Sequence, residues 1–354
     1  MIFNMDCRHG LAMMPDNSVD AIVTDAPYGI NFMGKKWDYD VPGVDIWVEC
    51  LRVLKPGGHL LAFAGTRTQH RMAVRIEDAG FEIRDMIAWV YGSGYPKHRS
   101  SLKPALEPIT MARKPAERAT LLNIDACRVE GRERTEYGLS NATRTAGNTY
   151  GTPSPGADFD STVGRYPANL IHDGSDEVVA MFPDSAGSGG SVPNVKISGY
   201  GDGAVGTGSA EYLGGERTKV DCGTGSAARF FYCAKAGKRD RNEGLEAFDA
   251  VMTNFAAGTG LSKNGDGSPR NMNADAKNPH PTVKPTELMR YLCRLVTPPG
   301  GLIVDPFAGS GSTGKAAILE GFQFVGFELD PQYTAIANAR VEAARDSLVR
   351  VELA

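Results

Sequence analysis

Residues 302–315 read LIVDPFAGSGSTGK, an apolar run that leads into a glycine-rich loop and then into a helix-forming stretch. Gly309, Gly311 and Gly314 have Gly-x-Gly-x-x-Gly spacing, and Glu328 follows about 20 residues later, at the end of the next apolar run. In a strand–loop–helix unit, such glycines let the backbone approach a ligand, and the acid accepts hydrogen bonds from ribose hydroxyls. The stretch therefore predicts an α/β sheet that binds an adenosine-type ligand.

The residues around the loop favour one class of ligand over two others. Lys315 completes a phosphate-binding pattern only in part, because Ala316 stands where a hydroxyl would hold magnesium. A dinucleotide fits the glycine spacing, but Asp305 places a carboxylate beside the loop, where it would repel phosphates. The same carboxylate suits the ammonium group of a methionine moiety. A tight glycine turn that binds no ligand is the remaining alternative.

A second motif, TDAPYG at residues 24–29, ends the first strongly apolar strand. Residues just beyond the carboxyl ends of strands face the ligand crevice of such sheets. Asp25 and the backbone carbonyl of Ala26 can each accept a hydrogen bond from an amine. Pro27 stiffens the turn, and Tyr28 offers a flat face for stacking. These groups suit a planar base that carries an amino group, although Asp-x-Pro-Tyr also occurs as a plain turn.

Strand and helix signals alternate at both ends of the chain. Near the N-terminus, strands are predicted at 19–24, 59–64, 82–90 and 109–112, and helices at 45–54 and 66–79. Near the C-terminus, strands are predicted at 302–305 and 322–328, and helices at 286–296, 313–320 and 332–345. This alternation favours a parallel sheet covered by helices on both faces. We therefore expect a Rossmann-like, doubly wound, mostly parallel sheet built from both chain ends.

The middle of the chain is irregular from about residue 116 to 278, with one short helix expected near 175–182. Twelve of the 42 residues from 185 to 226 are glycine. Ordering so many glycines costs too much entropy for a stable core, so this stretch predicts a mobile loop inside an insertion.

Together, the two motifs resemble those of the amino-group DNA methyltransferases, which act on N6 of adenine or N4 of cytosine. That family has an Asp-Pro-Pro-Tyr type motif and an Asp-Pro-Phe-x-Gly-x-Gly cofactor motif. The order here, with the catalytic motif first and the cofactor motif last, resembles the family's beta subgroup, and further stretches resemble prophage-type members. Ala26 replaces the first proline of the family motif, which keeps the backbone acceptor and loses only rigidity.

The resemblance implies a site-specific DNA methyltransferase that uses S-adenosyl-L-methionine and flips its target base out of the duplex. Asp rather than Ser at position 25 favours adenine over cytosine. The implied catalytic residues are Asp25, Ala26, Pro27 and Tyr28. The implied cofactor-binding residues are Asp6, Lys284, Asp305, Phe307, Gly309, Gly311, Ser312, Thr313 and Glu328. Lys284 is included because NPHPTVKP, residues 278–285, resembles the family segment that closes over the methionine end.

The resemblance also implies three regions. Residues 1–115 would form the catalytic half of the methyltransferase domain, 116–277 an inserted target-recognition region, and 278–354 the cofactor-binding half. Within the insertion, a basic cluster interleaved with aromatic residues predicts contacts with the phosphates of double-stranded DNA. The cluster consists of Arg229, Lys235, Lys238, Arg239 and Arg241. A solvated helix end is the competing interpretation.

Composition limits the remaining alternatives. The net charge of −4 means that a DNA-binding surface must be a local patch. The six cysteines and six histidines show no metal-ligand spacing, so no metal site is expected. No apolar run approaches the roughly 20 residues that span a bilayer, and no signal-peptide core is present, so we expect a cytoplasmic protein.

Two other classes of function stay open. One is a methyltransferase that acts on RNA or protein, and the other is a catalytically inactive DNA-binding protein, against which the intact Asp25, Asp305 and Glu328 argue. The resemblance also leaves open whether the chain forms a homodimer. It does not decide whether the chain works with a cognate restriction endonuclease or, as an orphan or prophage enzyme, without one.

Overall fold

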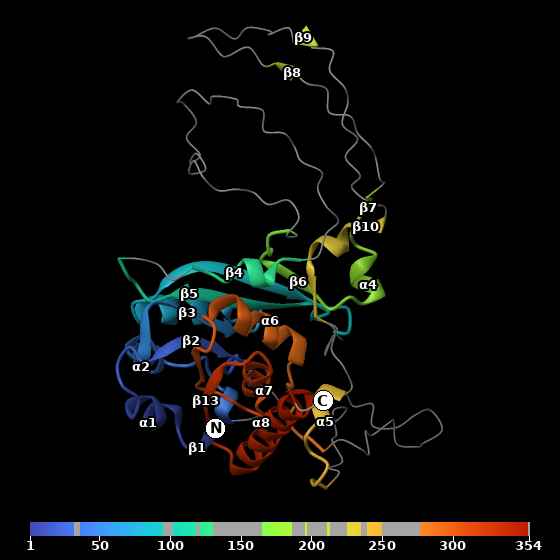
Figure 1. Ribbon diagram of the computed structural model, residues 1–354. Coiled ribbons are helices and arrows are strands. Elements are labelled where there is room, and N and C mark those ends of the chain that lie inside the picture. The colour runs from blue at the N-terminus through green and yellow to red at the C-terminus, as the bar shows by residue number, and fades with distance from the viewer. Residues whose placement is uncertain are drawn as a thin grey trace. The chain divides into compact units, whose positions relative to one another are not determined.

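The computed structural model describes residues 1–31, 36–94, 102–117, 121–129, 165–185, 195–196, 211–212, 225–234, 239–249 and 277–352 (Figure 1). The chain divides into two compact units. The first comprises Met1–Cys127, Tyr166–Val179 and Phe231–Ala354, and the second comprises Arg128–Arg165 and Ala180–Phe230. The first unit thus joins both ends of the chain.

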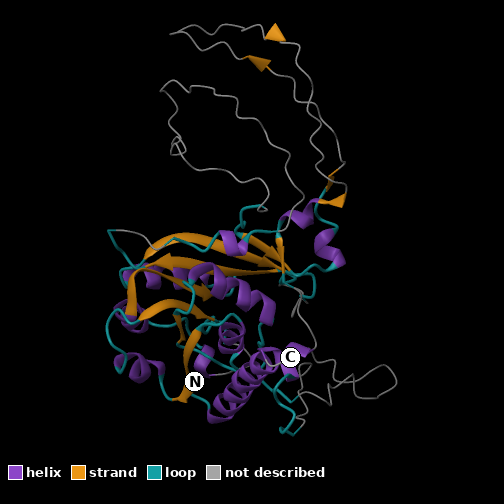
Figure 2. Ribbon diagram, in the orientation of Figure 1, coloured by secondary structure: helices purple, strands orange, loops and turns teal. Residues whose placement is uncertain are grey.

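Nine strands of the described residues form one sheet in the first unit, in the order β1-β13-β12-β2-β3-β5-β4-β6-β11. Figure 2 shows the strands in orange and the helices in purple. These strands are β1 (Ile2–Asn4), β2 (Val19–Thr24), β3 (Leu54–Phe63), β4 (Glu82–Val90), β5 (Leu106–Arg113), β6 (Leu170–His172), β11 (Tyr232–Cys233), β12 (Leu302–Asp305) and β13 (Gln323–Glu328). Among them, β5 alone runs antiparallel to its neighbours β3 and β4. The predicted mostly parallel, Rossmann-like sheet is confirmed, and β12 lies directly beside β2.

Helices cover both faces of this sheet. They are α1 (Cys7–Ala12), α2 (Val44–Val53), α3 (Gln69–Asp78), α6 (Thr286–Val296), α7 (Ser312–Leu319) and α8 (Pro331–Glu352). Because successive side chains of a strand point to opposite faces, Ala21 and Val23 of β2 pack in a core with α6, α7 and α8. Ile22 between them packs in a second core with α1, α2 and α3. The doubly wound arrangement is confirmed.

Several boundaries differ from the sequence-based prediction. Residues 55–58, which lie between the predicted helix 45–54 and the predicted strand 59–64, instead belong to β3. Helix α2 ends at Val53 and the strand starts at once. The strand predicted at 109–112 was too short. Its pairing with β4 continues as far as Leu106 opposite Val90, so that Glu107 and Pro108 also lie within β5. The prediction started the strand too late, because a charged residue (Glu107) and a proline (Pro108) are not typical of a strand interior.

Two strands of the sheet come from the region predicted as an insertion. The strand β6 pairs in parallel with β4, and β11 pairs in parallel with β6. With three and two residues, they are too short to show the alternation of apolar and polar residues that marks a strand. The same region contributes η3 (Asp125–Cys127), α4 (Asp176–Val179) and α5 (Arg239–Asn242) to the first unit. The helix expected at 175–182 is therefore shorter than predicted.

The described part of the second unit contains short elements only. The strand β7 (Asp184–Ser185) pairs antiparallel with β10 (Gly225–Ser226), and β8 (Val195–Lys196) pairs antiparallel with β9 (Glu211–Tyr212). The 3-10 helix η4 (Ala227–Phe230) follows β10. Most of the glycine-rich stretch 185–226 lies outside the described residues, so its predicted mobility stays a prediction.

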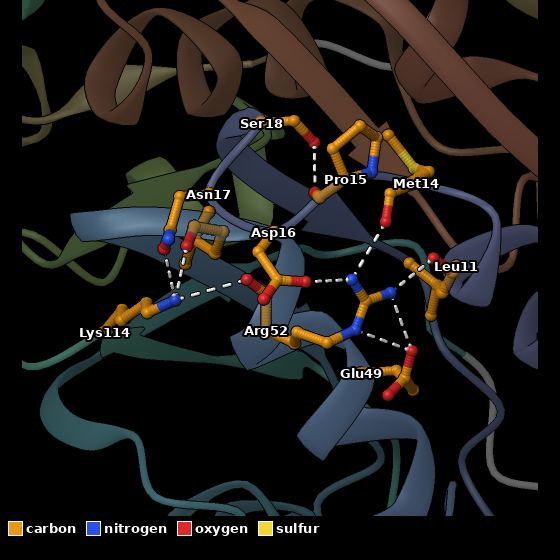
Figure 3. A network of polar contacts seen from close by, with 10 residues as sticks. Leu11, Met14, Pro15, Asp16, Asn17, Ser18, Glu49, Arg52 and Lys114 are labelled. Atoms are coloured by element: carbon orange, nitrogen blue, oxygen red, sulfur yellow. Dashed lines mark hydrogen bonds and ion pairs between the residues drawn. The ribbon is translucent and has the colours of Figure 1, made fainter.

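A polar network joins elements at the amino ends of β2 and β3 (Figure 3). The guanidinium of Arg52, near the end of α2, donates to the carbonyls of Leu11 at 2.8 Å and Met14 at 2.9 Å and pairs with Glu49 at 2.8 Å. The ammonium of Lys114, just after β5, donates to the carbonyl of Leu54 at 2.8 Å. This edge is opposite to the carboxyl ends of the parallel strands, where ligands bind in such folds, so the network serves stability.

Candidate active site

A cavity of about 1770 Å³ opens at the carboxyl ends of β2, β12 and β13. Parallel strands end at the same edge of a sheet, so the two sequence motifs meet there. The cavity is lined by most of the predicted site residues, namely Asp6, Asp25, Ala26, Pro27, Tyr28, Lys284, Asp305, Phe307, Gly309, Ser312, Thr313 and Glu328. Gly311 is not among the lining residues.

The end of β2 is joined directly to the end of β12. The hydroxyl of Thr24 donates a hydrogen bond of 2.6 Å to Asp305, which also accepts the backbone N–H of Phe307 at 3.0 Å. Asp305 is 1% exposed, and this burial raises the pKa of its carboxyl to about 6. No cationic side chain of the described residues pairs with it. A buried carboxylate that lines a cavity is therefore ready for a cationic ligand group.

The glycine loop has two distinct faces. Gly309 and Gly311 both have positive φ angles, of +53° and +79°. A Cβ atom at Gly309 would lie 2.9 Å from the imidazole of His280, whereas one at Gly311 would lie 2.9 Å from Ala337 of α8. Gly309 therefore lets the loop pass close to the cavity wall, and Gly311 lets the loop pack against α8. The two glycines of the motif thus avoid collisions with different neighbours, His280 in the cavity wall at Gly309 and α8 at Gly311.

Two acids lie at the edge of the sheet formed by β1 and β13. Glu328 accepts the backbone N–H groups of Gly309 and Asp330, both at 2.8 Å, and burial raises the pKa of its carboxyl. Each carboxylate oxygen keeps a lone pair for a ligand. The backbone N–H of Met5 donates to the Glu328 carbonyl at 3.0 Å, which places Asp6 next to this strand. Asp6 also caps α1, because its side chain accepts the N–H of Arg8 at 2.8 Å.

The first turn of α7 carries Ser312 and Thr313 into the cavity wall. The side chain of Lys315 points elsewhere, since its ammonium pairs with Glu243 at 2.7 Å and does not line the cavity. A phosphate-binding loop would need this lysine on the ligand. The position of Lys315 therefore argues against a nucleotide triphosphate as the ligand of this loop, as the missing hydroxyl at Ala316 also does.

Four polar side chains meet beside the N-terminal motif. The ammonium of Lys284 lies 2.7 Å from Asp25 Oδ2 and 3.3 Å from Glu107 Oε2. The hydroxyl of Tyr28 lies 3.0 Å from Asp25 Oδ1 and 2.8 Å from Glu107 Oε2. The side chains of Lys284, Asp25 and Glu107 are only 6%, 18% and 21% exposed. We call these four residues the carboxylate cluster.

Burial and the ammonium of Lys284 determine which groups of the carboxylate cluster are charged. Burial raises the pKa of Asp25, although the neighbouring Lys284 acts against this. Burial alone would lower the pKa of Lys284, but Asp25 and Glu107 together raise it. Burial and the two carboxylates raise the pKa of Tyr28 well above its ordinary value. Tyr28 is therefore neutral and Lys284 charged at neutral pH.

The turn that carries Tyr28 is held from three sides. Asp38, which is 1% exposed, accepts the backbone N–H groups of Tyr28 at 2.7 Å and Gly29 at 2.9 Å. The hydroxyl of Thr68 donates to the Tyr28 carbonyl at 2.5 Å. Gly29 has φ +65°, and a Cβ atom there would lie 2.6 Å from the backbone of Val41. The motif is thus fixed by residues that the sequence did not indicate as part of the site.

Glu107 is the most important residue that sequence reasoning missed. Its signal was weak, because one acid at the start of an apolar run reads as a strand boundary. His280 was also missed, and its ring packs over Gly309 and edge-on against Tyr333, with ring centroids 4.7 Å apart. Lys284, predicted from the resemblance to help close over the methionine end of a cofactor, lines the cavity and pairs with Asp25.

The predicted basic cluster is only partly described. Arg229 lies in η4 and Arg239 begins α5, but their side chains, like all of Lys235 and Lys238, lie outside the described residues. Arg241 is described, and its half-buried guanidinium donates to the carbonyls of Asn278 at 3.2 Å and His280 at 2.8 Å. It therefore holds the segment that leads to Lys284. Its predicted contact with DNA phosphates stays a prediction.

The sequence profile of the DNA methylases that modify N6 or N4 amino groups matches residues 19–339, most of the chain. The chain belongs to this DNA methylase family. The profile begins with β2 and ends within α8, so it includes both motifs of the methylase site.

Individual relatives match over shorter stretches. The type II methyltransferase M.XycI of Xanthomonas campestris pv. cyanopsidis is 37% identical over 75 residues, which are 21% of this chain and 25% of that protein. The DNA adenine methyltransferase YhdJ of Escherichia coli K12 is 38% identical over 65 residues, or 18% of this chain and 22% of that protein. The chain thus matches a quarter or less of the length of these relatives.

Solved structures are similar over more of the chain at lower identity. The cytosine-N4-specific PvuII DNA methyltransferase is 16% identical, with a TM-score of 0.49 over 99% of this chain and 91% of that one. The M1.HpyAVI–SAM complex is also 16% identical, with a TM-score of 0.46 over 96% of this chain and 98% of that one.

The described residues contain neither a cluster of metal ligands nor a membrane-spanning helix. No group of three or more metal-ligating side chains comes together in that part of the chain. Within the same residues, no helix is both long and apolar enough to cross a membrane.

Proposed function

We propose that this chain is a DNA methyltransferase that transfers a methyl group from S-adenosyl-L-methionine to the exocyclic amine of a flipped base, with adenine as the preferred target. The observation that carries the proposal is the hydrogen bond between Thr24 and Asp305, which brings the two sequence motifs to one cavity. Membership of the DNA methylase family supports it.

The side chains that line the cavity suit S-adenosyl-L-methionine in charge and hydrogen bonding. The buried carboxylate of Asp305 would hold the ammonium group of the methionine moiety. Glu328, whose oxygens keep free lone pairs, would accept the ribose hydroxyls, and Asp6 would lie near the adenine. Gly309 lines the cavity and has no side chain, so its backbone allows close approach. When bound, the cofactor supplies a methyl group on a positively charged sulfonium.

The residues of the N-terminal motif would act on the amine. Its lone pair is delocalised into the base, which makes it a poor nucleophile. Asp25 and the Ala26 carbonyl would accept hydrogen bonds from its N–H groups and favour a tetrahedral nitrogen. Pro27 stiffens the turn, and in-line attack needs the reacting atoms about 3–3.5 Å apart. Flipping the base costs a few kcal/mol. Stacking on Tyr28 would return about 1–3 kcal/mol of that cost.

The remaining assignments are part of the same proposal. Residues 116–277 would hold most of the target-recognition surface, and Arg229, Lys235, Lys238 and Arg239 would contact the phosphates of double-stranded DNA. The strands β6 and β11 are exceptions within residues 116–277, since both belong to the sheet of the first unit. We further propose that the protein acts in the cytoplasm.

Methyl transfer from radiolabelled S-adenosyl-L-methionine to duplex DNA, RNA and protein tests the function. We expect label in duplex DNA alone, and none with the Asp25→Ala variant. Mass spectrometry of the digested DNA separates N6-methyladenine from N4-methylcytosine. Label in RNA or protein would contradict the proposed substrate, and N4-methylcytosine would contradict the proposed base.

A further inference from the structure

Both oxygens of Asp25 are already engaged. Oδ2 accepts the Lys284 ammonium at 2.7 Å, and Oδ1 lies 3.0 Å from the Tyr28 hydroxyl. Each oxygen keeps a second lone pair, but a target amine that donates to Asp25 must share the charge of this carboxylate with the two donors already present. The amine would bind more strongly if one of these donors moved to another acceptor. A buried ammonium that lost its carboxylate partner without a replacement would be strongly destabilised.

A replacement is present at Glu107. Its Oε2 lies 2.8 Å from the Tyr28 hydroxyl and 3.3 Å from the Lys284 ammonium, the same two donors that engage Asp25. The Tyr28 hydroxyl has a single proton and two carboxylates within reach, so it can change acceptor without moving far. Lys284 has three protons and can turn from one carboxylate to the other.

We propose that Glu107 is a positioning residue that keeps Tyr28 and Lys284 in place while Asp25 releases them to bind the amino group of the target. This inference rests on the proposed function of Asp25. It adds a residue outside both sequence motifs and gives Lys284 a role at the base-binding end of the cavity.

The backbone around Glu107 suits this role. Glu107 lies within β5 and pairs with Trp89 of β4, so the sheet fixes its position. Asp25, by contrast, follows the last residue of β2 and lies in the loop between the strand and the rest of the motif. The cavity reaches both side chains. A second acceptor fixed beside Asp25 is the arrangement that an exchange of donors requires.

The decisive variant is Glu107→Gln, which keeps the shape but binds an ammonium less strongly than a carboxylate does. Lys284 should then stay on Asp25, and kcat should fall about tenfold or more. The Kd for S-adenosyl-L-methionine and the melting temperature should change little. Glu77→Gln, on the exposed surface of α3, makes the same change of charge away from the cavity and should keep wild-type kcat.

Two readouts separate this role from a merely structural one. If Glu107 acts through Lys284, Glu107→Gln should lower kcat by less than about threefold in a Lys284→Met background. The groups facing Asp25 are Lys284, Tyr28, Glu107 and, more remotely, Asp305. Without the Glu107 charge, and with Lys284 held on Asp25, the pKa of Asp25 falls, so the acid limb of the kcat profile should move to lower pH.

The outcomes are distinct. Wild-type kcat in Glu107→Gln, equal losses with and without Lys284, or an unmoved acid limb would each overturn the inference while leaving the proposed function intact. A wild-type protein that binds S-adenosyl-L-methionine but methylates no nucleic acid would overturn the proposed function, and the inference with it.

Discussion

Thr24 and Asp305, 281 positions apart in the sequence, are joined by a hydrogen bond of 2.6 Å from Thr24 Oγ1 to Asp305 Oδ1. The bond exists because β2 and β12 are neighbours in the sheet although they come from opposite ends of the chain. It links Thr24, the first residue of the N-terminal motif, to Asp305, the first residue of the Asp-Pro-Phe-x-Gly-x-Gly motif. The base-binding and cofactor-binding ends of the proposed site are thus rigidly coupled.

Replacing Thr24 by Val should weaken cofactor binding. The change keeps the shape of the side chain and removes one donor from a buried carboxylate, which costs about 1–3 kcal/mol. Because the lost hydrogen bond favoured the charged form, the pKa of Asp305 should rise further. Calorimetry between pH 5.5 and 8 should show weaker binding of S-adenosyl-L-methionine, most clearly at the acid end. Thr24→Ser, which keeps the donor, is the control, and equal affinities for both variants would contradict the argument.

Asp305→Asn should separate stability from binding. Burial raises the pKa of Asp305 from 3.8 to about 6, so the stability that its neutral form contributes is lost as the pH rises between these values. Asparagine keeps the acceptor for Thr24 and never ionises. At pH 7 the variant should therefore melt at or above the wild-type temperature. Its affinity for S-adenosyl-L-methionine should fall at least about tenfold, because the ammonium loses its countercharge.

The wild-type protein provides a check on this prediction without mutation. Its affinity for S-adenosyl-L-methionine should decline as the pH falls through about 6, where Asp305 takes up a proton. The Asp305→Asn variant should show no such decline. A variant that melts lower at pH 7 and binds like the wild type would show that Asp305 is structural.

Asp25→Ala should abolish methyl transfer and leave the affinity for S-adenosyl-L-methionine within a few-fold. The variant should fold, because Lys284 keeps Glu107 as a partner at 3.3 Å. Glu328→Ala should do the reverse, weakening cofactor binding and preserving turnover at saturating cofactor. Single-turnover kinetics with titrated cofactor distinguish the two. Near-wild-type turnover by Asp25→Ala would refute its catalytic assignment.

The fold and the positions of the two motifs at the ends of strands could be predicted from the local sequence, because strand–helix alternation and glycine spacing are short-range signals. It could not predict Glu107, whose place beside Asp25 depends on β5 joining β3 in an antiparallel pair. Gly309 and Gly311 look equivalent in the sequence, and packing against α8 alone distinguishes them. Arg241 belongs to a basic cluster in the sequence, and its bonds to backbone carbonyls depend on the fold.

Arg52→Met should lower stability without affecting the site. Its guanidinium is 28% exposed and donates to two backbone carbonyls and two carboxylates at the amino ends of the strands (Figure 3). Losing charged hydrogen bonds of this kind should cost about 2–3 kcal/mol. Denaturant titration should show the loss, while kcat and the KM for cofactor stay at wild-type values below the melting temperature. A change in KM would mean that this edge communicates with the cavity.

The basic residues of the predicted DNA-binding surface can be separated by their salt dependence. Each phosphate contact contributes about 0.9 to the slope of log affinity against log salt concentration. If Lys235, Lys238 and Arg239 contact phosphates, replacing all three by alanine should weaken duplex binding, flatten this slope, and leave cofactor affinity unchanged.

Arg241 should behave in the opposite way, although it lies two residues beyond Arg239. Its guanidinium is bonded to the carbonyls of Asn278 and His280, and the His280 ring packs over Gly309. Arg241→Ala should therefore weaken S-adenosyl-L-methionine binding and leave the salt slope as in the wild type. Measuring both affinities for both variants at several salt concentrations decides the matter. Superimposable slopes for the wild type and the triple variant would mean that the three residues form a solvated surface, so that other residues must contact the phosphates.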